Sequence, residues 1–326
     1  MNEKGLAVLE QYDLDVRNAR RGRGSFLIDT DKGMKILTEF TGTEERLRFQ
    51  SRVMEHLREQ GMDRLDFPVP DKEGNFLVKD REEMTYTLRD WHEGRECDAR
   101  NLSDVQEAVR SLAFLHRCFV LPEVEGGKDY GETSLAEEFA RKNVELRKIR
   151  KFVRTRRRKN DFEQEFLQQF EEFYEEAQRA EDAAASEEAG ELYAESLKKG
   201  CLCHGDYNHH HVLLSDEGTA LTEFGHCHYG IQIGDFCQFF RKILEKTNWD
   251  QTVGSAMLRE YYRVRPLSEL ERNNLRIRLL YPEKFWKIAN HYYGSNKAWQ
   301  PVKNMEKLNV LTAQRKQKEA FLKILQ

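Results

Sequence analysis

The chain has 326 residues, with 53 basic and 57 acidic side chains and a formal net charge of -4 at pH 7. This length is sufficient for two packed lobes, and the near balance of charge argues against nucleic acid as a general partner. No apolar run approaches the roughly 18 residues of a membrane span, and the N-terminus lacks the pattern of a signal peptide. We expect a soluble protein whose six cysteines are reduced thiols.

The first 90 residues predict a small antiparallel sheet with one helix. Short β-type runs separated by turns occur at 24–30, 34–40, 76–79 and 86–88. The turn Asp31-Lys32-Gly33 between the first two runs predicts a hairpin, and residues 43–60 carry apolar side chains near helical spacing. Arg21-Gly22-Arg23-Gly24 before the first run fits either a phosphate-binding loop or an ordinary basic turn, and both interpretations stay open.

A long helix is predicted after a polar connection at 91–98. From Ser103 onward, apolar side chains recur at i, i+3 and i+4, which indicates a helix with one buried face, capped by Asn101 or Ser103. His92 and His116 lie in these two segments. A histidine on an apolar helix face is more often a core residue than a ligand, so we interpret both as structural.

Residues 135–200 predict two helices of opposite charge. Residues 141–160 hold 11 basic side chains and one acidic, whereas 161–191 hold 12 acidic and one basic. Aromatic side chains at helical spacing run under the acidic part, which indicates a packed helix: Phe162, Phe166, Phe170, Phe173 and Tyr174. We favour an antiparallel pair whose charges face each other; the alternative is that the basic helix 141–159 docks an anionic partner. Residues 190–200 are expected to be a link.

The segment 203–236 carries the candidate chemistry. In Cys203-His204-Gly205-Asp206, a polar turn with one aspartate stands between apolar runs, a pattern that presents a carboxylate on a rigid loop at the mouth of a cleft. Cysteine and histidine are frequent here, but adjacent residues seldom reach the same ion, and no C-x-x-C or H-E-x-x-H spacing is present. We therefore do not expect a structural zinc site.

The sequence HGDYNHHHVLL at 204–214 resembles the HGDxxxxN loop of the aminoglycoside phosphotransferases and choline kinases, a branch of the protein-kinase-like fold. This resemblance implies that Asp206 is the catalytic base, which accepts the proton of the attacking hydroxyl. It also implies that His204 and Asp235 are structural braces of this loop.

The same resemblance shows three altered cofactor positions. The family's two magnesium ligands, an Asn and an Asp, correspond to His211 and Glu223, and the position of its phosphate-binding strand lysine is Thr38. Side chains alternate along a strand, so Lys35 faces away from Thr38 and would replace that lysine only after a register slip. Imidazole is a poor magnesium ligand, so we expect weak or absent binding of ATP and magnesium. A manganese or zinc site of Asp206, His211 and Glu223 is a separate hypothesis.

Three further motifs narrow the resemblance: GRECD at 94–98, LAFLH at 112–116 and YPEKFWKIANHYY at 281–293. With the basic helix, they resemble the CotS-type spore coat proteins of endospore-forming bacteria. This resemblance implies a protein of the mother-cell cytoplasm that is deposited in the coat or acts in its assembly. Other coat proteins are the expected partners, with neither nucleic acid nor membrane, and the docking alternative for 141–159 then involves an acidic coat protein.

These observations predict an α+β chain with the two-lobe protein-kinase-like fold, a β-rich lobe at 1–90 and a helical lobe at 91–326 that includes 203–236. Further helices are expected at 252–263, 269–280, 282–293 and 304–325. The favoured function is a pseudokinase of the spore coat. The alternative is an active ATP-dependent phosphotransferase, for a small molecule or a protein, that uses Asp206 as its base with an atypical metal site.

Overall fold

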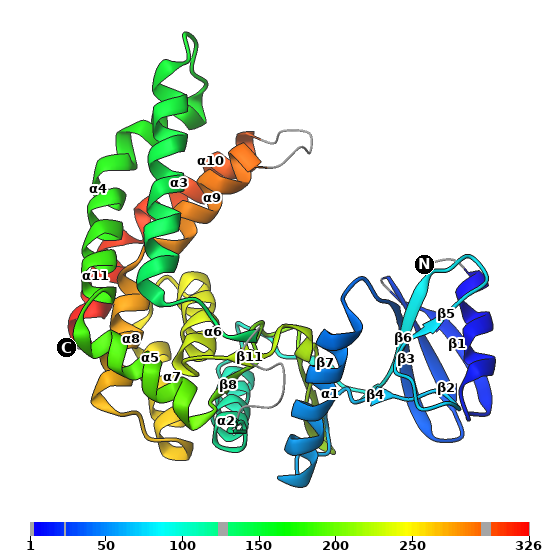
Figure 1. Ribbon diagram of the computed structural model, residues 1–326. Coiled ribbons are helices and arrows are strands. Elements are labelled where there is room, and N and C mark those ends of the chain that lie inside the picture. The colour runs from blue at the N-terminus through cyan, green and yellow to red at the C-terminus, as the bar shows by residue number, and fades with distance from the viewer. Residues whose placement is uncertain (1–2, 23, 123–129, 295–300, 326) are drawn as a thin grey trace. The chain divides into compact units, whose positions relative to one another are not determined.

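A computed structural model describes residues 3–22, 24–122, 130–294 and 301–325. The chain forms two compact units, each made of two separate stretches of sequence (Figure 1). The first unit contains Met1–Tyr130 and Gly200–Tyr229, and the second contains Gly131–Lys199 and Gly230–Gln326. This division differs from the predicted lobe boundary at residue 90.

The first unit is built on an antiparallel sheet of order β1-β2-β3-β6-β4, with β5 paired to β6. Its strands are β1 (Val16–Arg21), β2 (Ser25–Thr30), β3 (Gly33–Glu39), β4 (Pro68–Val69), β5 (Val78–Lys79) and β6 (Thr85–Asp90). The predicted hairpin is confirmed, because β2 and β3 pair with each other and Gly33 takes the positive φ of +86° that a glycine tolerates best. In the basic turn before β2, the amide of Gly22 donates to the Ser25 carbonyl (2.8 Å), while Arg23 lies outside the described residues.

A 3-10 helix that was not predicted, η1 (Glu3–Gln11), covers one face of this sheet. Val8 and Leu9 of this helix, and Tyr12 just after it, pack into a single core with apolar side chains of the sheet. The sheet contributes Phe26, Ile28, Leu37, Val78, Tyr86 and Leu88. The N-terminal segment therefore covers the face of the sheet that carries Leu37.

Two helices and two short sheets complete the first unit. The predicted helices are confirmed as α1 (Glu44–Glu59) and α2 (Leu102–Cys118), and the side chain of Asn101 caps α2. The remaining strands form a sheet of order β10-β9-β7 and a β11-β8 pair. They are β7 (Arg95–Glu96), β8 (Leu202–Cys203), β9 (Val212–Ser215), β10 (Gly218–Leu221) and β11 (His228–Tyr229).

Direct contacts explain why Gly200–Tyr229, which we call the central stretch, belongs to the first unit. Strand β7 pairs with β9, and Leu65 forms a bridge with Leu221. The guanidinium of Arg46 in α1 donates to the carbonyls of Gly225 (2.8 Å) and Cys227 (2.5 Å). These interactions join residues far apart in sequence, and for this reason the unit extends well beyond residue 90.

The second unit is helical in the part that the structure describes. Its helices are α3 (Leu135–Thr155), α4 (Asp161–Ala184), α5 (Glu187–Lys199), α6 (Ile233–Lys246), α7 (Gln251–Val264), α8 (Glu269–Leu280), α9 (Glu283–Gly294), α10 (Pro301–Ala313) and α11 (Arg315–Ile324). The predicted link at 190–200 is wrong, because α5 occupies most of it, and the single helix predicted at 304–325 is divided at Gln314. No helix within the described ranges is long and apolar enough to cross a membrane.

Helices α3 and α4 form a hairpin whose aromatic face is buried (Figure 1). The predicted stripe on α4 is confirmed as core. Phe166 and Phe173 stack on the ring of Phe285 in α9, with ring centroids 5.2 and 4.6 Å apart. Burying a phenylalanine side chain stabilises a fold by about 1.5–3 kcal/mol relative to leaving it exposed, so this stripe holds the hairpin firmly on the other helices.

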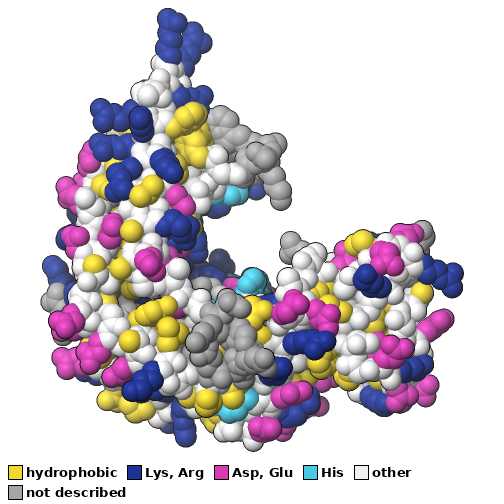
Figure 2. Space-filling view, viewed as in Figure 1, with side chains coloured by type: hydrophobic (Ala, Val, Ile, Leu, Met, Phe, Trp, Pro, Cys, Tyr) yellow, Lys and Arg dark blue, Asp and Glu magenta, His cyan; other side chains and the backbone are white. Residues whose placement is uncertain are grey.

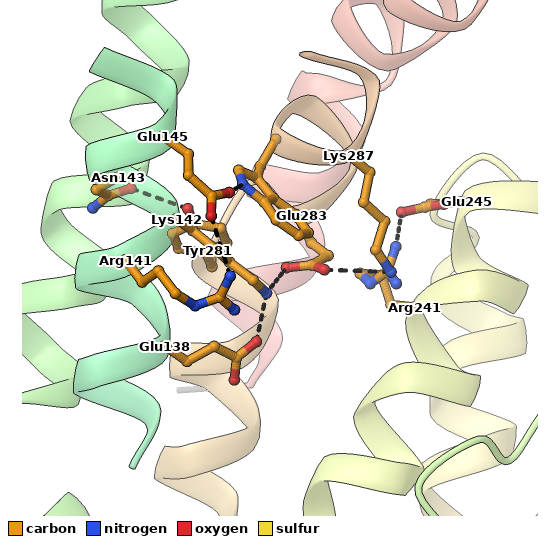
Figure 3. Close-up of polar contacts among 11 residues, drawn as sticks. Glu138, Arg141, Lys142, Asn143, Glu145, Arg241, Glu245, Tyr281, Glu283 and Lys287 are labelled. Atoms are coloured by element: carbon orange, nitrogen blue, oxygen red, sulfur yellow. Dashed lines mark hydrogen bonds and ion pairs between the residues drawn. The ribbon is translucent and has the colours of Figure 1, made fainter. Parts of the chain in front are cut away.

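A buried polar network also joins α3 to α9 (Figure 3). The ammonium group of Lys142 lies 2.5 Å from a carboxylate oxygen of Glu138 and 2.6 Å from one of Glu283. The hydroxyl of Tyr281 donates to the side-chain oxygen of Asn143 (3.0 Å). Burial alone would raise the pKa of Glu283, but Lys142 and neighbouring cations hold that pKa below its ordinary value. The network therefore keeps its charges paired inside the unit.

Candidate functional site

The loop between β8 and β9 presents Asp206 in a fixed backbone conformation. Gly205 has a φ of +82°, and a Cβ atom there would lie 2.2 Å from the carbonyl oxygen of His226, so the position requires glycine. The carboxylate of Asp206 is 38% exposed. The loop thus presents one accessible carboxylate, and the role of Asp206 as a catalytic base stays a prediction.

The ring of His204 links the backbone of this loop to that of Thr222 through two hydrogen bonds. Its ring is fully buried, the amide of Asp206 donates to its Nδ1 (3.3 Å), and its Nε2 lies 3.0 Å from the carbonyl oxygen of Thr222. Because Nδ1 accepts a hydrogen bond, the proton of the neutral ring is on Nε2, which donates to Thr222. The ring also packs on Phe224, with centroids 4.6 Å apart. His204 therefore connects Asp206 to the segment that carries Glu223.

Asn208, which was not predicted, organises the turn after Asp206. Its side-chain NH2 group donates to the backbone carbonyl of Asp206 (3.0 Å), and its side-chain oxygen accepts from the backbone amide of His210 (3.0 Å). An asparagine two residues after an aspartate is a common turn signal, because its side chain can bond to nearby backbone groups. The triple histidine that follows obscures this signal in the sequence.

His211 directs its Nδ1 atom into the loop itself. This atom lies 2.9 Å from the amide nitrogen of Asn208, 2.9 Å from the carbonyl oxygen of Asp206 and 3.7 Å from the carboxylate of Asp206. Within the described residues, no group of three or more His, Cys, Asp or Glu side chains is arranged to hold a metal ion. Asp206, His211 and Glu223 accordingly do not form the three-ligand manganese or zinc site of the separate hypothesis.

Glu223 is held by a cluster of charges that the sequence did not reveal. Its amide donates to a carboxylate oxygen of Asp66 (3.0 Å), and its own carboxylate lies 3.2 Å from the guanidinium of Arg89. That guanidinium also pairs with Asp66 at 2.6 Å. Asp66 is only 2% exposed, and burial raises its pKa to about 6, although Arg89 acts to lower it. We call Asp66, Arg89 and Glu223 the charge cluster.

The strand register places this cluster on the face of the sheet that also carries Thr38. Thr38 pairs with Thr87 and Ile36 pairs with Arg89, so these four side chains share one face. Lys35 is on the other face, as predicted, where its ammonium group lies 2.8 Å from Asp90 and 2.6 Å from the carbonyl of Lys32. The cation on the Thr38 side of β6 is therefore Arg89, and its charge is shared between two carboxylates.

The remaining candidates have structural surroundings. Asp235 belongs to the second unit, where it is buried in the first turn of α6; its role as a brace of the loop stays a prediction. His92 makes a hydrogen-bond contact with the carbonyl of Leu65 (2.9 Å), and His116 is buried in α2. Both histidines are consistent with the structural role that we assigned to them.

These residues do not fit a magnesium-bound nucleotide. Such a ligand needs a cation for its phosphates and oxygen ligands in nearly octahedral geometry for the metal. The three corresponding positions offer a threonine hydroxyl at Thr38, an imidazole turned toward its own loop at His211, and a carboxylate of Glu223 that is paired with Arg89. The arrangement retains one carboxylate, Asp206, that is placed to accept a proton.

The fold defines the class of protein. The structure is similar to an aminoglycoside phosphotransferase from Alicyclobacillus acidocaldarius subsp. acidocaldarius DSM 446, with a TM-score of 0.86 and 20% identity over 98% of this chain and 94% of that chain. It is also similar to choline kinase LicA from Streptococcus pneumoniae, with a TM-score of 0.52 and 13% identity over 94% of this chain and 97% of that chain. The α+β, protein-kinase-like fold is therefore confirmed.

The chain belongs to a family of spore coat proteins with this fold, described as "Spore coat putative kinase YutH", whose sequence model matches residues 6–325. Spore coat protein S of Bacillus subtilis (strain 168) is 23% identical over 322 residues, which cover 94% of this chain and 88% of that protein. The resemblance to CotS-type spore coat proteins, inferred from short motifs across the chain, is confirmed.

Proposed function

We propose that this chain is a pseudokinase of the spore coat, which acts in coat assembly or structure without transferring phosphate. Its family membership supports an association with the coat. The observation that carries the non-catalytic part is the ion pair between Glu223 and Arg89, anchored by Asp66. We further propose that the protein is made in the mother-cell cytoplasm, is deposited in the coat and has other coat proteins as partners.

The charge cluster opposes a metal ion at residue 223. A divalent cation there would have to replace Arg89 as the partner of the Glu223 carboxylate, with a guanidinium 3.2 Å from that carboxylate. Removing one partner from a buried ion pair costs about 3–5 kcal/mol, because the other charge is left without compensation. The Arg89–Asp66 pair is buried in this way and holds Arg89 in place, whereas the Glu223 carboxylate is 48% exposed, so its own pair with Arg89 contributes less.

An active phosphotransferase is the second candidate, and the accessibility of Asp206 favours it. This carboxylate is 38% exposed on a loop that Gly205 and His204 hold rigidly. Such an enzyme would use Asp206 as the base that accepts a hydroxyl proton. The two candidates differ in whether the chain binds a metal nucleotide at all.

A thermal-shift titration with ATP in the presence of magnesium or manganese tests the proposal. We expect no saturable change in the melting temperature, whereas a ligand at 100 times its Kd would stabilise the protein by about 2.7 kcal/mol. The matched variant Thr38→Lys/His211→Asn/Glu223→Asp restores the family's residues, shortens the carboxylate that Arg89 holds, and should bind. A metal-dependent rise in the wild-type chain, together with ATP hydrolysis that Asp206→Asn abolishes, would show that the protein is an enzyme.

A further inference from the structure

The turn of the α3–α4 hairpin and the exposed face of α3 carry cations that the fold does not use. The side chains of five basic residues make no ion pair or hydrogen bond within the described ranges, and all five are exposed: Lys148, Lys151, Arg154, Arg157 and Arg158. Figure 2 shows Lys and Arg side chains gathered around the end of this hairpin. We call these five residues the free basic face.

The acidic helix α4 neutralises a different set of basic residues. Arg150 pairs with Glu171, and Arg156 pairs with Glu163, which is fully buried. Arg147 donates to the hydroxyl of Tyr174 (2.5 Å). The prediction that the two helices neutralise each other thus holds for part of α3, and the free basic face is what remains. Arg156 is paired with Glu163 and is therefore not part of the free basic face.

Two exposed apolar side chains of α3, Val144 and Phe152, lie beside the free basic face. Val144, Lys148, Lys151 and Phe152 follow the i, i+4, i+7, i+8 spacing of one helical stripe, and Phe152 is 53% exposed. From Lys148 to Arg154 the helical rise is about 9 Å, and Arg157 and Arg158 lie in the turn beyond the end of α3 at Thr155. The surface is therefore an elongated basic strip with an aromatic side chain at its centre.

This chemistry fits an acidic protein segment better than a lipid surface. A helix that lies on a membrane buries a broad apolar face in the lipid. The broad apolar face of α3, with Leu146, Ile149 and Val153, is instead buried in the core of the second unit. A narrow strip with positive charge and one exposed ring matches the acidic rim and apolar centre of a protein partner.

We infer that the free basic face of α3, with Phe152, is a docking surface for an acidic amphipathic segment of a partner protein. The charges set the orientation and the association rate, and the contact weakens as salt screens them. Phe152 supplies the desolvated centre of the interface.

Binding of a synthetic helical peptide with a glutamate stripe and one leucine per turn tests this inference on the full-length protein. We expect the wild-type chain to bind it at low ionic strength and to lose the affinity as salt is added. The variant Lys148→Ala/Lys151→Ala/Arg157→Ala/Arg158→Ala should bind about tenfold more weakly. Its melting temperature should stay close to that of the wild type, because these side chains are exposed and make no internal contact.

A matched control removes four other exposed cations of the second unit: Arg259→Ala, Lys303→Ala, Lys307→Ala and Lys316→Ala. This variant has the same net charge, so equal weakening in both variants would show attraction to overall charge and would overturn the inference. Failure of the wild type to bind the peptide, unchanged binding by the first variant, or equal binding of a peptide with glutamine in place of glutamate would also overturn it. Tighter binding to anionic vesicles or DNA than to the peptide would assign the face to another class of partner.

Discussion

Glu223 adopts a left-handed backbone conformation, with φ of 69° and ψ of 49°. For a residue with a Cβ atom this conformation costs roughly 1–2 kcal/mol. Two interactions maintain it here, one from its amide to Asp66 and one from its carboxylate to Arg89. The charge cluster therefore fixes both the backbone and the side chain of Glu223, the position that corresponds to a magnesium ligand in the resemblance drawn from the sequence.

Asp66 is expected to make the stability of the first unit depend on pH. Burial raises its pKa from 3.8 to about 6, against the opposing effect of Arg89. The folded state thus holds the Asp66 proton more tightly than the unfolded state. The resulting stabilisation is present below pH 3.8 and is lost as the pH rises to about 6. At 1.36 kcal/mol per pKa unit, the loss is about 3 kcal/mol.

We would measure this effect by denaturant unfolding of the wild type and of Asp66→Asn at several pH values between about 4 and 7. The contributions of the other titrating groups cancel when the two proteins are compared at each pH. The wild type should lose free energy of unfolding relative to the variant across this range. Parallel stability curves would mean that Asp66 ionises in the folded state as it does in the unfolded chain.

At the residue scale, the sequence indicated single candidate positions but not their partners. Asp206 and His204 are candidates because HGD is a local motif that resembles the loop of a known family. Asp66 and Arg89 were missed, because their importance arises only when β6, the Asp66 segment and the segment after β10 are brought together. Nothing local distinguishes an arginine in a strand that faces solvent from one that faces a buried carboxylate.

In the α3–α4 hairpin, some charged side chains are paired within the fold and others are exposed to solvent. Glu163 is fully buried, caps α4 together with Asn160, and accepts from Arg156 and from the hydroxyl of Tyr293 (3.2 Å). Arg157 lies beside Arg156 in the turn and has no such partner within the described residues. Neighbouring arginines therefore have opposite roles.

The paired substitutions Arg156→Ala and Arg157→Ala should separate these roles. Arg156→Ala leaves the buried carboxylate of Glu163 without its cation and is expected to cost about 1–3 kcal/mol of stability. Arg157→Ala is expected to change stability by less than about 0.5 kcal/mol. Urea unfolding of both variants gives the two values. Equal effects would contradict the assignment of Arg156 to the fold.

The elements with strong local signals were predicted well. The β2–β3 hairpin has a glycine turn, and α2 has a polar cap before an amphipathic run. β1 was missed because its sequence, VRNARR, lacks alternating apolar residues, and it becomes a strand by pairing with β2. The segment from Gly190 was taken for a link, but Gly190 lies within α5, where a Cβ atom at its position would meet no other atom within 4 Å.

At the scale of the whole molecule, each unit is assembled from two stretches of sequence. The first unit needs Gly200–Tyr229 to supply β9 and β10 to the sheet that β7 begins, and this stretch also forms the separate β11-β8 pair. The sequence could not show this division, because it depends on pairings between residues more than a hundred positions apart, such as Leu65 with Leu221. The boundary predicted at residue 90 rested on the order of the short β-type runs, and it falls at the end of the N-terminal sheet.

A fragment of residues 1–130 is therefore expected not to fold. It lacks β9, the strand that pairs with β7, and it leaves Arg46 and Arg89 without their partners in the central stretch. A chain in which a Gly/Ser linker joins Tyr130 directly to Gly200 and ends at Tyr229 should regain a cooperative thermal transition by circular dichroism. An equally cooperative transition in the fragment alone would show that the first unit is complete without the central stretch.

Because each unit is made of two separate stretches of sequence, neither unit can finish folding until late in synthesis. The N-terminal sheet is synthesised first, yet its last partners arrive with Tyr229, after all of α3, α4 and α5. Helices α3 and α4 in turn share their core with residues of α8, α9 and α10, which are synthesised later. A stop codon at any position before Tyr229 consequently leaves both units unfinished, so truncation of the gene should yield chains for degradation and not a smaller working domain.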